Sequence, residues 1–209
     1  NTLIAGDSDH LWGDFLVKQG LVDPKTHKAL NELFYQQYQE GQLDIDEYLS
    51  FALGPMAGMT PKSLSALHRI FVKEHIEPIL LDRAFDLIQE HRIKGDTIVI
   101  ITATNTLVTR PIADRLGVEH LIGCEAEIEN GHFTGKPSGI PSFAEGKVIR
   151  IKSWCEARGQ SMDGAVFYSD SHNDLPLLQA VYKPVAVDPD DRLKREALRN
   201  GWDIISLRD

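Results

Sequence analysis

The sequence predicts an α/β protein in which a parallel β-sheet core carries an inserted α-helical cap. Residues 97–101 form a continuous β-branched run, which is typical of a strand buried on both faces of a parallel sheet. Beyond this run, strand-like and helix-like segments alternate to the end of the chain, which favours a parallel sheet. Residues 7–93 instead show helix signals and no hairpin signal, so we assign them to the cap.

The helices of the cap are predicted from their start signals and from the spacing of apolar residues. Helix starts are expected at Asp23-Pro24, Asp46, Thr60-Pro61 and Asp82. Behind the first of these signals, Leu30, Leu33 and Phe34 recur at helical spacing. Gly95 ends the last helix of this group, just before the first predicted strand.

A helix and a hairpin follow the first strand. Residues 106–116 predict the helix, and a short strand is expected at 120–123. Asn130-Gly131, flanked by strand-like residues, predicts a β-hairpin with a type I′ turn.

The remaining elements alternate between helix and strand. Ser142 and Glu145 match a capping box that opens a helix to about residue 158. After it we expect a strand at 165–168, a helix at 175–180, a strand at 185–187, a helix at 191–199 and a strand at 202–205.

Composition disfavours several classes of function. The 209 residues include 22 basic and 31 acidic side chains, for a formal net charge of −9. Such a surface repels polyphosphate backbones, so no nucleic-acid partner is expected, although a small anion can be held locally. No apolar run approaches the roughly 18 residues that span a bilayer, so no membrane partner is expected either. Cys124 and Cys155 show neither metal spacing nor pairing, which predicts buried thiols in a reduced cytoplasm.

Polar side chains follow the predicted strands, where the functional groups of an open parallel sheet collect. Thr102 follows the first strand, Asp170 and Asp174 follow the strand at 165–168, and Lys147 lies early in the helix after the hairpin. A hydroxyl, a lysine and carboxylates at one sheet edge suit a phosphoryl group with Mg²⁺. Each residue alone also has a simpler role, as a helix cap or as a solvated lysine. Their joint occurrence in this order favours a phosphate site.

This order of residues resembles the haloacid dehalogenase-like hydrolases. The matching segments are Thr102, Lys147 and the run Ser169-Asp170-Ser171-His172-Asn173-Asp174, and Asn1-Thr2-Leu3-Ile4 resembles the end of the family's first motif. The resemblance covers the whole chain and is strongest to the phosphoserine-phosphatase-like branch, which carries a helical cap after its first strand. It implies a Rossmann-like three-layer core over residues 1–6 and 94–209, with the cap over 7–93.

The resemblance also implies an activity, namely Mg²⁺-dependent hydrolysis of a small phosphorylated metabolite through an aspartyl-phosphate. The implied site consists of Thr102 and Lys147 as catalytic residues that bind the phosphate, Ala103 and Asn173 as further phosphate ligands, Asp170 and Asp174 as magnesium ligands, and Thr2 as a support of the first-motif loop.

The reacting carboxylates of the family are expected just before Asn1. In the family, the nucleophile and the general acid/base are two aspartates at that position, on the central strand, and neither is within the sequence given. A sheet without its central strand leaves unpaired backbone groups on both neighbours. We therefore expect the natural polypeptide to include this segment, and we expect no hydrolysis from these 209 residues taken literally.

The cap is expected to decide the substrate. Asp7 lies where the phosphoserine phosphatases carry a glutamate for the substrate amine, although it can equally cap a helix. Residues 41–60 contain neither lysine nor arginine, so a substrate carboxylate bound there would lack a cationic partner. With Asp9, Trp12 and nearby aromatic residues, this lining is similar to histidinol-phosphatase-type members, which favours histidinol phosphate.

Several alternatives stay open. Trp12, Phe34, Tyr35, Tyr38, Tyr48 and Phe51 can stack on a substrate ring or simply pack in a core. The alternative substrate is phosphoserine. A catalytically inactive binding protein is the alternative if the chain truly lacks both aspartates, and the fold also supports phosphoryl mutases and Mg²⁺-independent dehalogenases. The sequence does not indicate the oligomeric state.

Overall fold

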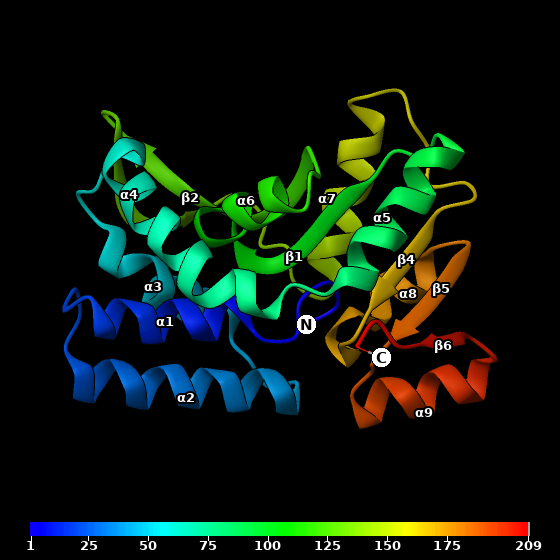
Figure 1. Ribbon diagram of the computed structural model, residues 1–209, viewed down its shortest axis with the longest axis horizontal. Helices are drawn as coiled ribbons and strands as arrows, with labels where there is room; N and C mark the ends of the chain where they lie inside the picture. The colour runs from blue at the N-terminus through cyan, green and yellow to red at the C-terminus, as the bar shows by residue number, and fades with distance from the viewer. Residues whose placement is uncertain (209) are drawn as a thin grey trace.

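The computed structural model describes residues 1–208 and arranges them as an α/β core beside a helical cap (Figure 1). The helical elements of the first part of the chain are α1 (Ser8–Lys18), α2 (Pro24–Glu40), α3 (Ile45–Leu53), the 3-10 turn η1 (Gly54–Met56), α4 (Pro61–Phe71), the π-helical turn η2 (Val72–Ile76) and the 3-10 turn η3 (Glu77–Ile79). The elements that follow are α5 (Asp82–Lys94), β1 (Val99–Asn105), α6 (Thr106–Arg115), β2 (His120–Glu129), β3 (His132–Ser138), α7 (Glu145–Glu156), β4 (Val166–Ser169), the 3-10 turn η4 (His172–Asp174), α8 (Leu175–Ala180), β5 (Lys183–Val187), α9 (Asp191–Asn200) and β6 (Asp203–Ile205).

The cap helices begin where the chain supplies N-cap side chains. The Asp23 carboxylate accepts a hydrogen bond from the backbone N–H of Thr26 at 2.8 Å, and proline follows at the first helical position. Thr60 and Ser63 form a capping box at the start of α4, where the sequence predicts a helix. Local chemistry thus determines where these helices start.

The start of α3 differs from the prediction. Asp44 caps this helix instead of Asp46, since its carboxylate accepts from the backbone N–H groups of Asp46 and Glu47 at 3.0 and 3.1 Å. Both aspartates offer the same chemistry, and the one placed just outside the first turn becomes the cap.

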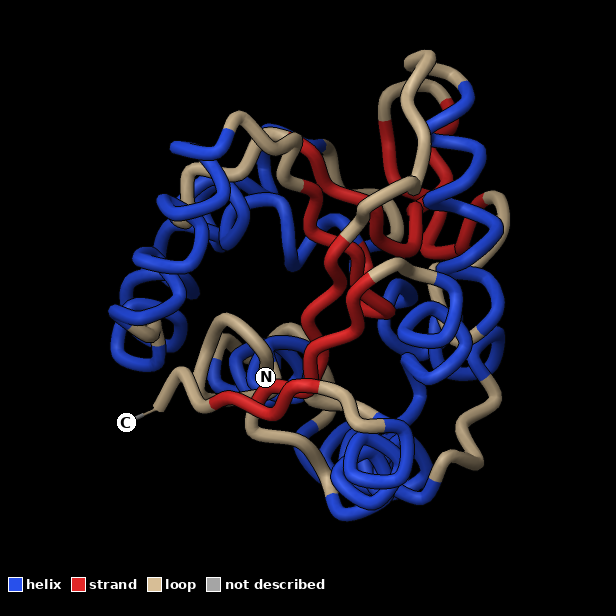
Figure 2. Tube along the Cα trace, turned by 90° about the vertical axis from the view of Figure 1, so that its right-hand side faces the viewer, coloured by secondary structure: helices blue, strands red, loops and turns tan. Residues whose placement is uncertain are grey.

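The strands form two sheets. In the described chain β1 pairs in parallel with β2, and β2 pairs in antiparallel fashion with β3. The second sheet is parallel throughout, in the order β4-β5-β6. Within residues 1–208 no strand joins β1 to β4, and a mainly apolar cavity of about 260 Å³ lies between them. Helices lie on both sides of the strands, which confirms the predicted α/β class (Figure 2).

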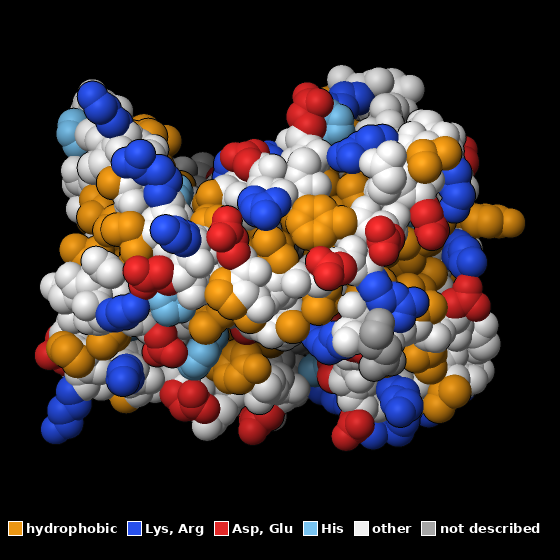
Figure 3. Space-filling model, in the orientation of Figure 1, with side chains coloured by type: hydrophobic (Ala, Val, Ile, Leu, Met, Phe, Trp, Pro, Cys, Tyr) orange, Lys and Arg blue, Asp and Glu red, His pale blue; other side chains and the backbone are white. Residues whose placement is uncertain are grey.

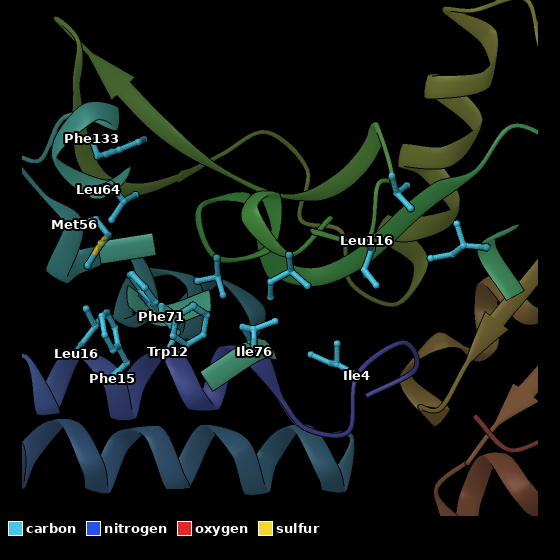
Figure 4. Packing of buried hydrophobic residues seen from close by; sticks show 14 residues of the cluster. Ile4, Trp12, Phe15, Leu16, Met56, Leu64, Phe71, Ile76, Leu116 and Phe133 are labelled. Atoms are coloured by element: carbon cyan, nitrogen blue, oxygen red, sulfur yellow. The ribbon is translucent and has the colours of Figure 1, made fainter. Parts of the chain in front are cut away.

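The β2–β3 hairpin reaches from the core onto the cap. Asn130 and Gly131 have φ angles of 50° and 78°, as the predicted type I′ turn requires. Beyond the turn, the N–H of Phe133 donates to the carbonyl of Met59 at 2.9 Å, and the N–H of Gly58 donates to the carbonyl of Phe133 at 2.8 Å. The Phe133 ring is buried in the same apolar cluster as Met56 (Figure 4). The hairpin therefore anchors the cap from the side.

The capping box predicted for α7 does not form. Ser142 is fully buried, its N–H donates to the Cys124 sulfur at 3.2 Å, and its hydroxyl has no partner among the described residues. The helix begins at Glu145, after Ala144 with φ 45°. Packing of Ser142 against β2 holds it away from the helix terminus, so it cannot cap.

The chain leaves the core near Ile4 and returns to it near Leu80, and these two segments pair at the boundary between cap and core. Ile4 and Leu80 form an antiparallel bridge, and the N–H of Ala5 donates to the carbonyl of Ile79 at 2.7 Å. The cap predicted over 7–93 also includes α5, whereas in the structure Ala84 of this helix packs against Val185 of the second sheet. Helix α5 therefore covers the core.

Both cysteines are buried free thiols, as predicted. Burial raises the pKa of Cys124 to about 11, so this thiol is not a ready nucleophile. Residues 1–208 contain no helix that is long and apolar enough to cross a membrane. On the face seen in Figure 3, acidic and basic side chains are interspersed.

Candidate active site

A cavity of about 150 Å³ lies between the cap and the ends of β1 and β4. Helices α1, α2 and α3 contribute one side of its lining, while Thr102, Lys147 and Asp170 contribute from the core. The carboxyl ends of parallel strands therefore open into this cavity, as the sequence predicts.

An irregularity in β1 brings residues 102–104 into the cavity lining. Ile101 pairs with Ile122 and Asn105 pairs with Cys124, so three residues of β1 stand opposite one residue of β2. That one residue is Gly123, where a Cβ atom would lie 2.9 Å from the carbonyl oxygen of Thr104. The strand thus bulges against a glycine and presents its threonines to the cavity.

Thr102 and Ala103 lie in this bulge and line the cavity, in the places predicted for phosphate ligands. The Thr102 hydroxyl accepts a hydrogen bond from the N–H of Thr104 at 3.2 Å. A hydroxyl that accepts from the backbone keeps its own proton for another acceptor, such as a phosphate oxygen.

Lys147 and Asp174 form a buried ion pair at the cavity wall. The Lys147 Nζ atom lies 2.5 Å from Asp174 Oδ1, and the two side chains are 5% and 9% exposed. The hydroxyl of Ser169 donates to the other Asp174 oxygen at 2.7 Å. Asp174 thus holds the lysine in place, and Lys147 keeps further N–H donors for an incoming anion. The implied role of Asp174 as a metal ligand is less direct, because both of its oxygens already have partners.

Asp170 is the carboxylate that best fits a magnesium ion. The Thr2 hydroxyl donates to Asp170 Oδ1 at 2.6 Å and so ties the N-terminal segment to the loop after β4. The Asp170 side chain is 20% exposed and lines the cavity. Mg²⁺ takes oxygen ligands and completes its shell with waters and substrate oxygens, so this donor chemistry fits. Among residues 1–208, acidic, histidine and cysteine side chains do not gather in a group of three or more around one point, so the described residues supply part of a coordination shell.

Asn173, implied as a phosphate ligand, instead joins the core to the cap. Its Nδ2 donates to the carbonyl of Tyr38 at 2.9 Å, near the end of α2. The Tyr38 hydroxyl donates to Ser171 Oγ at 3.1 Å, and Arg192 Nη1 donates to the carbonyl of Glu40 at 3.1 Å. We call these contacts between the end of α2 and the core the α2 latch.

His172 supports the α2 latch from the core side. Its N–H and its Nδ1 lie 2.7 and 2.8 Å from Asp190 Oδ2, and its Nε2 lies 3.1 Å from Arg192 Nη1. At the end of α2, Gly41 has φ 71°, and a Cβ atom there would lie 2.8 Å from His172 Nε2. His172 therefore lies in the turn η4 near the site, and it packs against a position at the end of α2 where only glycine fits.

Asp7 and Trp12, the predicted substrate ligands, have different positions. The Asp7 carboxylate caps α1 by accepting from the N–H groups of Asp9 and His10, and it also lines the cavity. Trp12 is 2% exposed and packs against Phe15 and Phe71 in the apolar cluster between the cap helices (Figure 4). It lies on the apolar face of α1, which turns away from the cavity, so we do not retain it as a ligand.

Of the other aromatic residues, most line the cavity and one packs between the cap helices. Phe34, Tyr35, Tyr38 and Tyr48 line the cavity, while Phe51 packs against Phe34 with ring centroids 5.1 Å apart. The spacing along α2 and α3 does not distinguish these roles, because both sets recur at helical intervals.

Asp9 is the site residue whose contacts the sequence does not reveal. It lies in the first turn of α1, and the hydroxyls of Tyr48 and Thr104 are near its carboxyl. Burial, together with the nearby Asp7 charge, raises the pKa of Asp9 to about 7. Burial and the Asp9 charge in turn hold the pKa of Tyr48 well above its ordinary value, so its hydroxyl stays a donor. The only local signal is a second carboxylate close after the helix cap.

Three comparisons with known proteins show what the chain is similar to. The sequence model of the haloacid dehalogenase-like hydrolases matches residues 1–179. The chain is 42% identical to a histidinol-phosphatase of Neisseria meningitidis serogroup C, over 100% of this chain and 96% of that one. It is 31% identical to a phosphoserine phosphatase of Mycobacterium tuberculosis, over 100% of this chain and 68% of that one. A crystal structure of a protein of unknown function from Bordetella pertussis Tohama I matches with a TM-score of 0.92 and 40% identity, over 99% and 94% of the two chains.

Proposed function

Because the chain belongs to the haloacid dehalogenase-like hydrolases and is a phosphatase of that family, we propose that it hydrolyses the phosphomonoester of a small cationic metabolite, with histidinol phosphate as the favoured substrate. The similarity to a histidinol-phosphatase along the whole chain supports this substrate.

The main observation in support of a cationic substrate is the charge distribution of the cavity. Among the described residues that line it, Lys147 is the sole lysine or arginine, and this side chain is paired with Asp174. The cap contributes Asp7 and Asp9 to the lining and no arginine. A substrate carboxylate would meet no free cation beside these carboxylates, whereas an amine or imidazolium gains favourable contacts. Histidinol phosphate carries both cationic groups and no carboxylate.

The phosphate end of the cavity supports phosphoryl transfer. Lys147 neutralises charge on the phosphate oxygens, and the Thr102 hydroxyl orients one of them. Asp170 would hold Mg²⁺, which when bound offsets the negative charge of the phosphate. We propose an aspartyl-phosphate route on the basis of the family resemblance, with the nucleophile and the general acid/base on the aspartates that the family motif places before Asn1. The reduced cytoplasm stays a proposal on the basis of the free cysteines.

Phosphoserine is the second candidate. The relative from Mycobacterium tuberculosis is named a phosphoserine phosphatase, and Asp7 lies where the family binds the substrate amine. Against it stands the absence of an arginine in the lining formed by residues 1–208.

A side-by-side assay tests the proposal on the full-length natural protein with Mg²⁺. Histidinol phosphate, phosphoserine, a sugar phosphate and p-nitrophenyl phosphate are compared by kcat/KM. We expect histidinol phosphate to exceed phosphoserine by at least about tenfold, the value of one charge-assisted contact. Chelation with EDTA should abolish turnover, and added Mg²⁺ should restore it. A clear preference for phosphoserine overturns the substrate assignment, and EDTA-insensitive turnover overturns the metal-dependent mechanism.

A further inference from the structure

Asp9 lies in the cavity lining where three elements meet. It belongs to α1, Tyr48 belongs to α3, and Thr104 belongs to the bulge of β1. All three residues line the same cavity, and both hydroxyls are near the Asp9 carboxyl. Thr104 follows Thr102 by two residues, so the carboxyl is close to the phosphate end of the cavity without belonging to it.

The polar neighbours of this carboxyl are hydroxyls, and none of the described lysine and arginine side chains forms an ion pair with it. Among the described residues, Lys147 is the sole lysine or arginine of the lining, and its ammonium is held by Asp174. Asp7 adds a second negative charge near Asp9, and its Oδ1 accepts both hydrogen bonds from the N-terminus of α1. A carboxylate with this environment gains from any cation that enters the cavity.

The walls beside Asp9 are aromatic. Phe34, Tyr35 and Tyr48 line the same cavity, and the ring of His10 lies 4.9 Å from that of Tyr35. Such walls accommodate a flat ring, and aromatic faces attract cations. A ring with a protonated N–H therefore satisfies both the walls and the carboxyl.

We infer that Asp9, which lines the cavity beside Tyr48 and Thr104, binds the protonated ring nitrogen of an imidazolium-type substrate and sets the specificity of the site. This inference rests on the proposed function, which it deepens by assigning the residue that recognises the ring. Asp7 caps α1 and remains available to bind a substrate amine.

The competing explanation is structural, since a carboxyl placed between α3 and β1 can also tie the cap to the core. If the role of Asp9 were purely structural, its substitution would lower kcat/KM by the same factor on every substrate. The readout that separates the two is therefore a ratio between substrates rather than activity on one of them.

The test compares wild type, Asp9→Asn and Tyr48→Phe in the full-length protein. Asparagine keeps the size of the side chain and removes its charge. The substrates are histidinol phosphate, phosphoethanolamine, which has an amine but no ring, and p-nitrophenyl phosphate, which has no cation. Binding of L-histidinol is measured separately by calorimetry. Asp46→Asn, which removes an exposed carboxyl of the cap, is the matched control.

For Asp9→Asn we expect the ratio of kcat/KM on histidinol phosphate to kcat/KM on p-nitrophenyl phosphate to fall at least about tenfold, and L-histidinol binding to weaken by a similar factor. Tyr48→Phe should shift both in the same direction by about threefold, and Asp46→Asn should shift neither. An equal loss on all substrates, or unchanged L-histidinol binding in both variants, overturns the inference. A larger loss on phosphoethanolamine overturns the choice of the ring nitrogen. If wild type prefers another ester, the proposed substrate fails, while L-histidinol binding still decides the subsite.

Discussion

The raised pKa of Asp9 has a consequence for stability as well as for specificity. The folded protein holds a proton on this carboxyl up to about pH 7, whereas the ordinary pKa of an aspartate, as in the unfolded chain, is 3.8. The stability that this proton contributes is fully present below pH 3.8 and is lost as the pH rises to about 7. Above that pH, Asp9 is ionised in the folded state, at the cost of its desolvation.

Asp9→Asn is therefore expected to stabilise the protein at neutral and alkaline pH. The melting temperature of the variant should exceed that of wild type by at least about 3 °C at pH 8, a shift of roughly 1 kcal/mol for a chain of this size. The difference should be smaller at pH 5, where wild type still holds the proton. Thermal melts at both pH values, with Asp46→Asn as the control, check this. A difference that is the same or larger at pH 5 would contradict the assigned cause.

Single side chains also show where local reasoning stops. Thr102, Lys147 and Asp170 are placed at the cavity as the strand-end pattern predicts. Trp12 and Asn173 are not, because each has a contact with a residue far away in the chain. Trp12 packs on Phe71, and Asn173 donates to Tyr38.

At the scale of elements, the bulge of β1 decides which atoms reach the cavity. It depends on Gly123 of the neighbouring strand, where a Cβ atom would lie 2.9 Å from the Thr104 carbonyl oxygen and 2.9 Å from Thr106 Cγ2. Backbone and a branched side chain do not yield cheaply at such distances. The glycine therefore matters for geometry across the strand pair, although it is distant from any reacting atom.

Gly123→Ala is expected to displace the bulge and with it Thr102. We expect kcat/KM to fall at least about tenfold on every phosphate ester, with a loss of stability of about 1–3 kcal/mol, the usual cost of overpacking. Gly54→Ala is the matched control, because its φ is −48° and a Cβ atom there meets nothing within 4 Å. Steady-state kinetics and thermal melts measure both effects. Equal behaviour of the two variants would show that the bulge tolerates a side chain.

At the scale of the whole molecule, two sets of hydrogen bonds join the cap to the core, in addition to an apolar cluster in which both take part. The β2–β3 hairpin pairs with the chain at Gly58 and Met59, and the α2 latch joins the other side through Asn173 and Arg192. In the latch, core donors approach the carbonyl groups at the end of α2, which are the negative end of its dipole. The hairpin contact uses backbone groups, whereas the latch uses side chains, so we expect the latch side to open first.

Arg192→Ala tests this expectation. Loss of one hydrogen bond from the latch should weaken the closed arrangement of cap and core, so we expect KM to rise about threefold. The value of kcat should change less, because the reacting groups are not altered. Hydrogen exchange should accelerate at the end of α2 and not at Gly58. Arg195→Ala, an exposed arginine of the same helix, is the control. If both hydrogen exchange at the end of α2 and KM are unchanged, the latch does not control how the cap closes on the core.

The sequence by itself determined the α/β class, the strands and helices of the core, most helix starts of the cap, the type I′ turn and the order of the polar residues at the strand ends. These follow from local causes, namely apolar periodicity, cap chemistry and turn residues, which act within a few positions of the chain. Only the tertiary structure decided that β1 bulges against Gly123, that Asp174 pairs with Lys147, and that Asp9 meets Tyr48 and Thr104. Each of these contacts joins segments that are far apart in the chain, so its geometry depends on how whole elements pack. No local pattern carries that information.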